Sequence, residues 1–258
     1  MQTSEIAQVN TELAPRRAEE IIAWAVRQYG DGLTFACSFG AEDMVVLDLL
    51  LQADADAAVF LLDTGRLHQE TYEVIEQTRR FYARAFTVYV PQTEALQGLL
   101  AAEGPNNFYR SIEARKACCG VRKVEPLARA LAGKAAWLTG LRRAQAVTRV
   151  DLPVVEIDEA HGGIAKINPL VNWSEEAVWA YIRERNLPYN ALHDRGFPSI
   201  GCAPCTRAVA PGDDLRAGRW WWEAPEHKEC GLHPAGDCTR LNARPKRDNA
   251  AAGTVPKR

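Results

Sequence analysis

Four of the seven cysteines form two tight pairs, and their spacing is the most informative chemical pattern in this 258-residue chain. Cys118 and Cys119 are adjacent, whereas Cys202 and Cys205 form a C-x-x-C motif in a loop with glycine and proline. Adjacent cysteines rarely bond to each other, because a vicinal disulfide is strained. Four thiolates suit a [4Fe–4S] cluster or a zinc site, and the adjacent pair favours the cluster. Two unrelated sets of buried thiols are the alternative.

A fifth cysteine, Cys230, stands apart in a polar segment near the C-terminus. A lone cysteine there suits a nucleophile, and positive charge from the nearby Lys228 and His233 would favour its thiolate form. An ordinary cysteine without a reactive role is the alternative. We interpret Cys238 as incidental rather than as a resolving thiol, and Cys37 as a buried, inert thiol.

Composition sets the class of protein. A hydrophobic content of 47% and a charged content of 25% are ordinary for a soluble globular protein. The net charge of -2 gives no bulk basic surface for nucleic acid. No apolar stretch is long enough to span a membrane, and the acidic N-terminus is unlike a signal peptide. We therefore expect a cytoplasmic protein, in which clustered cysteines bind metal or act in catalysis rather than form disulfides.

The elements that must position these residues alternate between strands and helices. Short apolar runs predict the strands, and periodic apolar residues predict the helices. This alternation predicts an α/β fold with a mostly parallel sheet and helices on both faces. The expected strands are 33–38, 57–62, 86–90 and 137–139, with one or two more in 153–167. The expected helices are 15–29, 42–51, one ending near residue 82, 115–131 and 174–185.

Domain boundaries follow from where this pattern begins and fades. Residues 1–14 are expected to be a flexible arm and residues 234–258 a flexible tail. Residues 15–233 would form the α/β domain with its irregular C-terminal segment. Ligands of parallel sheets bind beyond the carboxyl ends of the strands. The loops expected there are Ser38–Asp43, Asp63–Arg66 and Gly140–Arg149.

Four motifs together resemble the assimilatory adenylyl-sulfate (APS) reductases of the wider APS/PAPS reductase family. They are C-C-x-x-R-K-V-x-P-L from Cys118, the Gly201–Cys205 loop, R-A-G-R-W-W-W-E from Arg216 and K-E-C-G-L-H from Lys228. They occur in order and at compatible spacing. The resemblance implies an adenine-nucleotide α-hydrolase-like fold, with an irregular C-terminal segment stapled to it by a metal cluster. It also implies that Cys118, Cys119, Cys202 and Cys205 bind a [4Fe–4S] cofactor.

The same resemblance implies a reaction. The Cys230 thiolate would attack the sulfur of APS, AMP would leave, and an enzyme S-sulfocysteine would form, with His233 close by. An external dithiol such as thioredoxin would then release sulfite, in sulfate assimilation toward cysteine. The cluster-free branch of the family prefers the 3′-phosphorylated substrate PAPS and lacks both cysteine pairs. The pairs therefore favour APS, and a homo-oligomer is possible.

Cationic side chains must bind the phosphate and sulfate of this substrate. Lys123 lies one helical turn after Cys119, so the two side chains should lie on the same face of the helix. From there Lys123 would bridge the cluster and the sulfate. Arginine suits bidentate oxyanion binding. The candidate arginines are Arg142, Arg143, Arg149, Arg216 and Arg219.

The turn after the first strand is similar to the SGGxDS phosphate loop of ATP pyrophosphatases. Ser38, Gly40 and Asp43 would contact the substrate at a helix N-terminus. Phe39, Glu42 and Asp43 depart from the pattern, and the added carboxylate would repel a pyrophosphate. Other candidate substrate contacts are Leu62 and Thr64, for adenine and ribose, and Gly140.

Three other functions stay open. The first is a PAPS reductase, and the second is a zinc-stapled adenine-nucleotide-binding module without redox chemistry. The third is sulfur transfer to tRNA, against which stand the absence of a basic patch and of an intact SGGxDS motif. We expect Trp220–Trp222 to pack the C-terminal segment against the domain.

Overall fold

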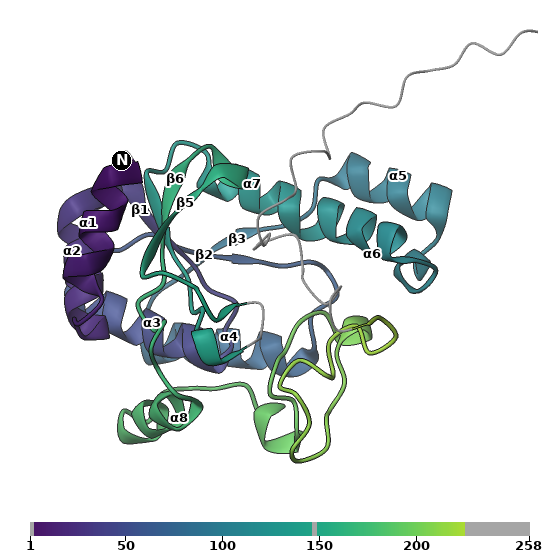
Figure 1. The fold of residues 1–258 in the computed structure, drawn as a ribbon. Coiled ribbons are helices and arrows are strands. Elements are labelled where there is room, and N and C mark those ends of the chain that lie inside the picture. The colour runs from purple at the N-terminus through teal and green to yellow at the C-terminus, as the bar shows by residue number, and fades with distance from the viewer. Residues whose placement is uncertain (1–2, 146–148, 225–258) are drawn as a thin grey trace, which may run out of the picture.

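A six-stranded sheet forms the centre of the computed structural model, which describes residues 3–145 and 149–224 (Figure 1). Its strand order is β3-β2-β1-β4-β6-β5, and every neighbouring pair is parallel except β5 and β6. The expectation of a mostly parallel sheet is therefore confirmed. The strands are β1 Leu33–Ala36, β2 Val59–Leu62, β3 Thr87–Tyr89, β4 Ala136–Leu138, β5 Val155–Asp158 and β6 Ile164–Ile167.

Eight α-helices accompany the sheet in the described part of the chain. A π-helical turn over Gly120–Val124 joins α6 to α7. It precedes Pro126, which lacks the N–H that would donate to the carbonyl of Arg122. The helices are α1 Thr3–Leu13, α2 Ala18–Tyr29, α3 Ala41–Ala53, α4 Gln69–Phe81, α5 Thr93–Glu103, α6 Ile112–Cys119, α7 Glu125–Leu131 and α8 Glu175–Glu184.

Successive strand residues point to opposite faces, and each face carries its own core. Phe35 and Leu138 belong to the larger core, which contains buried residues of α2, α3 and α8. Phe60 and Trp137 belong to the smaller core together with Leu127 of α7. Helices on both faces of the sheet are thus confirmed, as Figure 1 shows for α3 and α7.

The first residues are a packed helix rather than the flexible arm expected over residues 1–14. Helix α1 buries Leu13 in the larger core. The side chain of Asn10 donates to the carbonyl of Val155 at 2.7 Å and accepts from its N–H at 2.9 Å. These bonds cover part of the edge strand β5, which would otherwise expose unpaired backbone groups. The expectation failed because α1 has few apolar residues, and its main contacts are distant in sequence.

A buried carboxylate fixes α8 against α3 and α4. Asp48 of α3 is 4% exposed and accepts hydrogen bonds from the hydroxyls of Tyr82 and Tyr181, each at 2.8 Å. Ser174 caps α8 by accepting from the N–H of Ala177 at 3.2 Å, as its sequence predicted. Helix α8 is therefore held in a defined position, and it contributes a wall to the site described below.

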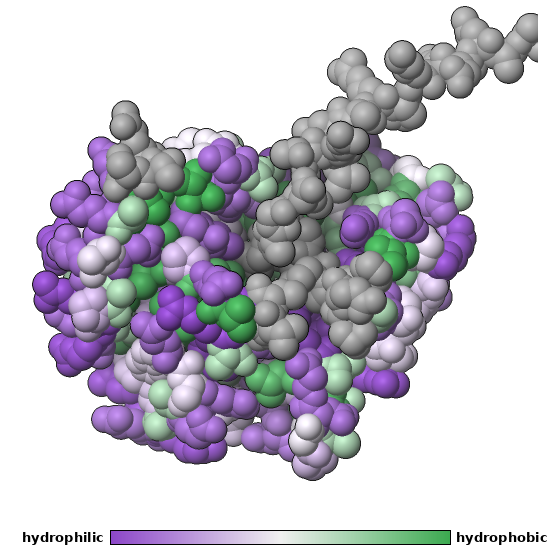
Figure 2. Space-filling model, in the orientation of Figure 1, coloured by the Kyte–Doolittle hydropathy of each residue, from purple (hydrophilic) through white to green (hydrophobic). Residues whose placement is uncertain are grey.

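Residues 186–224 contain no α-helix or strand, in agreement with the fading sequence pattern. Backbone bridges join Leu67 to Cys202 and Thr206 to Arg219, so this segment is attached both to the β2–α4 loop and to itself. Among the described helices, none has the length and apolar character needed to cross a membrane. On the face drawn in Figure 2, hydrophobic residues are scattered among hydrophilic ones.

Candidate active site

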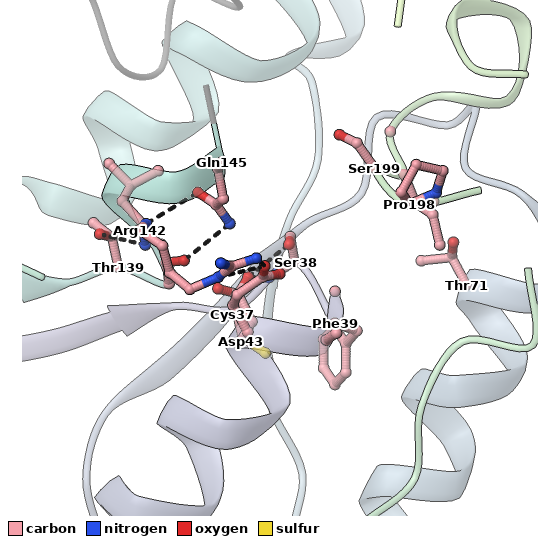
Figure 3. A pocket seen from close by; sticks show the side chains of 18 of the residues that line it. Cys37, Ser38, Phe39, Asp43, Thr71, Thr139, Arg142, Gln145, Pro198 and Ser199 are labelled. Atoms are coloured by element: carbon pink, nitrogen blue, oxygen red, sulfur yellow. Dashed lines mark hydrogen bonds and ion pairs between the residues drawn. The ribbon is translucent and has the colours of Figure 1, made fainter. Parts of the chain in front are cut away.

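A cavity of about 260 Å³ lies beyond the carboxyl ends of the central strands (Figure 3). The loops after β1 and β4, helix α8 and residues 193–219 form its walls. This position agrees with the strand-end site that the sequence predicted. The predicted binding residues that line it are Ser38, Gly40, Asp43, Leu62, Lys123, Gly140, Arg149, Arg216 and Arg219.

The loop after β1 brings the N-terminus of α3 to the cavity. Gly40 is the N-cap of this helix, and both Gly40 and Ala41 line the cavity. The partial positive charge of a helix N-terminus favours an anion or a polar ligand there. Phe39 has a φ of 60°, the left-handed conformation that glycine adopts easily at this place in the related phosphate loop. Its buried ring packs edge-on against Phe86 and holds the turn.

Asp43 does not present a free carboxylate to a ligand, in contrast to the repulsive role that we expected. Its Oδ2 atom accepts from the N–H and the hydroxyl of Ser38, each at 2.6 Å. The backbone N–H of Gly140 also bonds to this carboxyl group. Burial raises the pKa of Asp43 to about 6, although the bonds from Ser38 act in the opposite direction. Asp43 therefore joins the β1 loop to the β4 loop.

Gly140 has no room for a side chain at this junction. A Cβ atom at Gly140 would lie 2.3 Å from Oδ1 of Asp43. We expect Gly140→Ala to separate the two loops and, if the cavity takes the adenine nucleotide that the sequence motifs imply, to weaken the binding of AMP as a probe by about 10-fold or more. Calorimetric titration with AMP measures this change. Gly98→Ala is the matched control, because a Cβ at Gly98 meets nothing within 4 Å, and equal losses in both variants would contradict the prediction.

Two of the candidate arginines are committed to protein partners. Arg142, which is 2% exposed, donates from Nε and Nη2 to Oε1 of Glu42 at 2.9 and 2.7 Å. It lines the cavity, but Glu42 compensates its charge. Arg143 bonds to the carbonyl of Leu152 and to Asn172, and it does not line the cavity. The protein contacts of Arg142 and Arg143 do not support their candidacy as substrate ligands, which stays a prediction.

Gln145 organises the same loop and was not predicted. Its Oε1 atom accepts from Nη1 of Arg149 at 2.6 Å and from the N–H of Arg142 at 3.1 Å. Figure 3 shows Gln145 and Arg142 on one side of the cavity and Ser199 on the other. No local sequence pattern marks a glutamine for this role.

Arg216 and Arg219 reach the cavity from the tryptophan-containing segment. The guanidinium of Arg219 lies 4.7 Å from the centre of the Trp220 ring, and that of Arg216 lies 5.9 Å from it. Trp220 is 2% exposed, so the expected packing of this segment is confirmed at this residue. Arg219 also donates to the hydroxyl of Ser199 at 3.3 Å. Packing and hydrogen bonding thus fix the Arg219 cation in the cavity wall.

The four paired cysteines line a second, smaller cavity. Cys118 and Cys119 reach it from α6, and Cys202 and Cys205 reach it from the C-terminal segment. Burial raises the pKa of Cys205 to about 12, with the other thiols of the cavity adding to the effect. The sequence expectation that both pairs meet at one place agrees with this arrangement. The cationic residues that border the cavity are Arg66, Arg115, Arg122 and Lys123.

Four cysteines at one cavity supply the number of thiolates that a [4Fe–4S] cluster or a zinc site would need. In such a cluster each thiolate binds a different iron, whereas zinc draws all its ligands onto one ion. The surrounding cations suit a site that collects four thiolates.

An ion pair between Arg115 and Glu223 joins the end of the described chain to α6. Arg115 is fully buried and donates from Nε and Nη2 to Glu223 at 2.9 and 2.6 Å. Its guanidinium also lies 4.7 Å from the centre of the Trp220 ring. Removing one partner of a buried ion pair typically lowers the free energy of unfolding by about 3–5 kcal/mol, because the other charge is left buried without compensation. The tryptophan segment is therefore fastened beside the four-cysteine cavity.

Lys123 borders both cavities, and among the described residues it is the one that they share. This placement agrees with the predicted bridge between a cluster and the substrate. Thr64, in contrast, does not line the larger cavity. It is fully buried, with its hydroxyl 3.3 Å from the sulfur of Cys202, so the expected nucleotide contact by this side chain is not supported. Cys230 and His233 lie outside the described residues.

Comparisons with known proteins agree with this geometry. Residues 32–208 match the phosphoadenosine phosphosulfate reductase domain. The chain is 51% identical over 228 residues to the adenosine 5′-phosphosulfate reductase of Allochromatium vinosum, covering 87% of this chain and 88% of the relative.

Comparison with solved structures shows which proteins share this fold. The crystal structure of phosphoadenylyl-sulfate reductase from Candida auris, a phosphate complex, superposes with a TM-score of 0.69 at 31% identity, covering 81% of this chain and 98% of that chain. FMN adenylyltransferase from Candida glabrata shares the fold alone, with a TM-score of 0.53 at 17% identity over 91% of this chain and 79% of that chain. These findings confirm the resemblance that the four motifs indicated: the chain belongs to the phosphoadenosine phosphosulfate reductase family.

Proposed function

We propose that this protein is an adenylyl-sulfate reductase that converts APS to sulfite and AMP. The observation that carries the proposal is the position of Lys123 between a cationic strand-end cavity and a cavity lined by four cysteines. The relative from Allochromatium vinosum, which is named for this activity, supports the choice of substrate. The larger cavity would hold the nucleotide, and its cations would bind the phosphate and sulfate groups.

Different groups of the described residues would bind different parts of the substrate. The N-terminus of α3 and the junction of Ser38, Asp43 and Gly140 would shape the nucleotide site. Lys123 and Arg219 would hold the sulfate so that its sulfur faces an attacking thiolate. Cys118, Cys119, Cys202 and Cys205 would hold a [4Fe–4S] cluster, which would order the site and tune the charge beside the sulfate.

The nucleophile in this proposal is Cys230, near His233. Its thiolate forms a bond to the sulfur of APS, the bond from that sulfur to the bridging oxygen breaks, and AMP leaves with the electron pair. A dithiol of the thioredoxin type then attacks the sulfur of Cys230, sulfite leaves, and a second thiol of the donor completes a disulfide. The dithiol is thereby oxidised and the sulfur reduced. Sulfite made in the cytoplasm would supply cysteine synthesis.

The first test is the anaerobic absorption spectrum of the purified protein, with iron and sulfide analysis and an APS turnover assay. We expect a broad band near roughly 400 nm and about four irons per chain, as is typical of a [4Fe–4S] protein. We also expect sulfite release from APS when a reduced dithiol protein is supplied. A colourless protein with one zinc and no turnover would support the nucleotide-binding alternative instead.

PAPS reduction is the second candidate, because the solved relative from Candida auris is named for that substrate. The two substrates differ by one phosphate group, which PAPS carries on the 3′-oxygen of the ribose. The ratio of kcat/KM for APS and PAPS in the same preparation separates them. A higher value for PAPS would replace the first proposal by the second.

A further inference from the structure

The guanidinium of Arg219 lies against the start of the cysteine loop, the Gly201–Cys205 segment that contains two of the four paired cysteines. Its Nη1 atom donates to the hydroxyl of Ser199 and to the carbonyl of Ile200, each at 3.3 Å. Ser199, Ile200 and Gly201 all line the larger cavity, as Arg219 does. The guanidinium is therefore surrounded by residues of the cavity wall, and the chain that leads into the cysteine loop holds it there.

Gly201 leaves room for this guanidinium because it has no side chain. A Cβ atom at Gly201 would lie 2.6 Å from Cζ of Arg219 and closer still to Nη2, whereas real Cβ contacts are essentially never shorter than 3.0 Å. The φ of Gly201 is outside the left-handed region, so the conformation of its backbone does not by itself require glycine. The space that Arg219 occupies is what requires it.

Thr206 fixes the backbone on the other side of this contact. Its hydroxyl accepts from the N–H of Gly201 at 3.1 Å and donates to the carbonyl of Cys202 at 3.0 Å. Thr206 also pairs with Arg219 in a backbone bridge. These bonds tie the cysteine loop to the backbone of Arg219, so the two segments cannot move apart easily.

A methyl group added at Gly201 would therefore move the guanidinium rather than the loop. The guanidinium is the end of a long side chain with many rotamers, whereas hydrogen bonds hold the backbone around it. Gly218 is a contrasting case, because a Cβ atom there would meet the backbone carbonyl of Arg207, which cannot yield in the same way. The absence of a side chain at Gly201 thus determines where the charge of Arg219 lies.

We propose that Gly201 is a positioning residue for oxyanion binding. Its missing side chain lets the guanidinium of Arg219 lie in the wall of the larger cavity, where it binds an oxyanion group of the substrate. This inference rests on the proposed function, which supplies the anion, and it makes the cysteine loop part of the oxyanion site. A guanidinium that is already held in place loses less side-chain freedom when it binds the anion.

The test is calorimetric titration with APS in the Cys230→Ser background, without a dithiol, so that binding is measured without turnover. We expect Gly201→Ala to weaken APS binding by about 10-fold or more, because a displaced guanidinium loses charge-assisted hydrogen bonds to the anion. Gly98→Ala is the matched control for an added methyl group, since a Cβ atom at Gly98 meets nothing within 4 Å. It should bind APS as the background protein does.

Arg219→Ala shows whether Gly201 acts through the arginine. Alone, this variant should weaken APS binding by about 10- to 100-fold. When Arg219→Ala is already present, Gly201→Ala should weaken binding by no more than about a further twofold, because the group that the methyl would displace is gone. The inference is overturned if Gly201→Ala keeps full affinity, or if it costs the same factor with and without Arg219.

Metal content separates this role from a purely structural one. Gly201→Ala should keep the metal content and the visible spectrum of the background protein, because the methyl displaces the arginine and leaves the cysteines in place. Loss of the metal would show that the glycine maintains the cysteine loop itself, and the inference would be wrong. If the Cys230→Ser protein with Gly201 intact does not bind APS, the proposed function fails instead.

Discussion

Cys230→Ser is expected to abolish sulfite formation from APS, with a loss of more than about 1,000-fold in kcat. A serine hydroxyl at neutral pH is a far weaker nucleophile than a thiolate, and it cannot form the S-sulfocysteine. AMP binding should be unchanged, because AMP lacks the sulfate group that the Cys230 thiolate is proposed to attack. The measurement is sulfite release under single-turnover conditions, together with the mass of the protein after incubation with APS.

The protein offers its own control for this prediction. Cys238 is a second cysteine in the same C-terminal stretch. Cys238→Ser should retain full activity, and it should gain the mass of one sulfonate group in the presence of APS as the wild type does. If Cys238→Ser is as inactive as Cys230→Ser, the two thiols act together and the single-nucleophile mechanism is wrong.

Lys123→Met should reduce kcat/KM for APS by about 100- to 1,000-fold, the loss typical of removing one preorganised charge from a developing anion. Methionine keeps the length of the side chain and removes the ammonium group. Because AMP lacks the sulfate, AMP affinity should fall much less than the turnover of APS. Steady-state kinetics with APS and titration with AMP measure the two effects separately.

The control for this variant is Lys116→Met. Lys116 is an exposed lysine on α6, the helix that continues into the π-helical turn carrying Lys123. It should leave turnover unchanged. Iron content and the visible spectrum should be the same in Lys123→Met as in the wild type. A Lys123→Met protein that loses its iron would show that Lys123 maintains the four-cysteine site, and the proposed contact with sulfate would be withdrawn.

Much of the fold was predictable because local patterns determine it. Short apolar runs identified the parallel strands, and Ser174 identified the start of α8. Helix α5 was not anticipated, since it has no fully buried residue and contains Gly98, so its sequence has no clear apolar stripe. Helix α1 was missed because its bonds to Val155 connect residues that are far apart in the chain.

The candidate site was predictable in its location but less so in its contacts. The topology rule for parallel sheets placed the loops after β1 and β4 at one edge. Sequence could not show that Glu42 pairs with Arg142, because one hundred positions separate them and both would pass for surface charges. It also suggested that Asp43 opposes an anion, whereas the fold turns this carboxylate toward Ser38 and Gly140.

The Arg115–Glu223 ion pair has a consequence for how the proposed nucleophile meets its substrate. It anchors the chain at Glu223, seven residues before Cys230. Whatever path those residues take, the Cα of Cys230 stays within about 25 Å of the Cα of Glu223, since a fully extended chain spans at most about 3.6 Å per residue. One thiol in a sphere of that radius corresponds to an effective concentration of about 25 mM. The same cysteine supplied on a separate peptide would have to approach that concentration to react as fast.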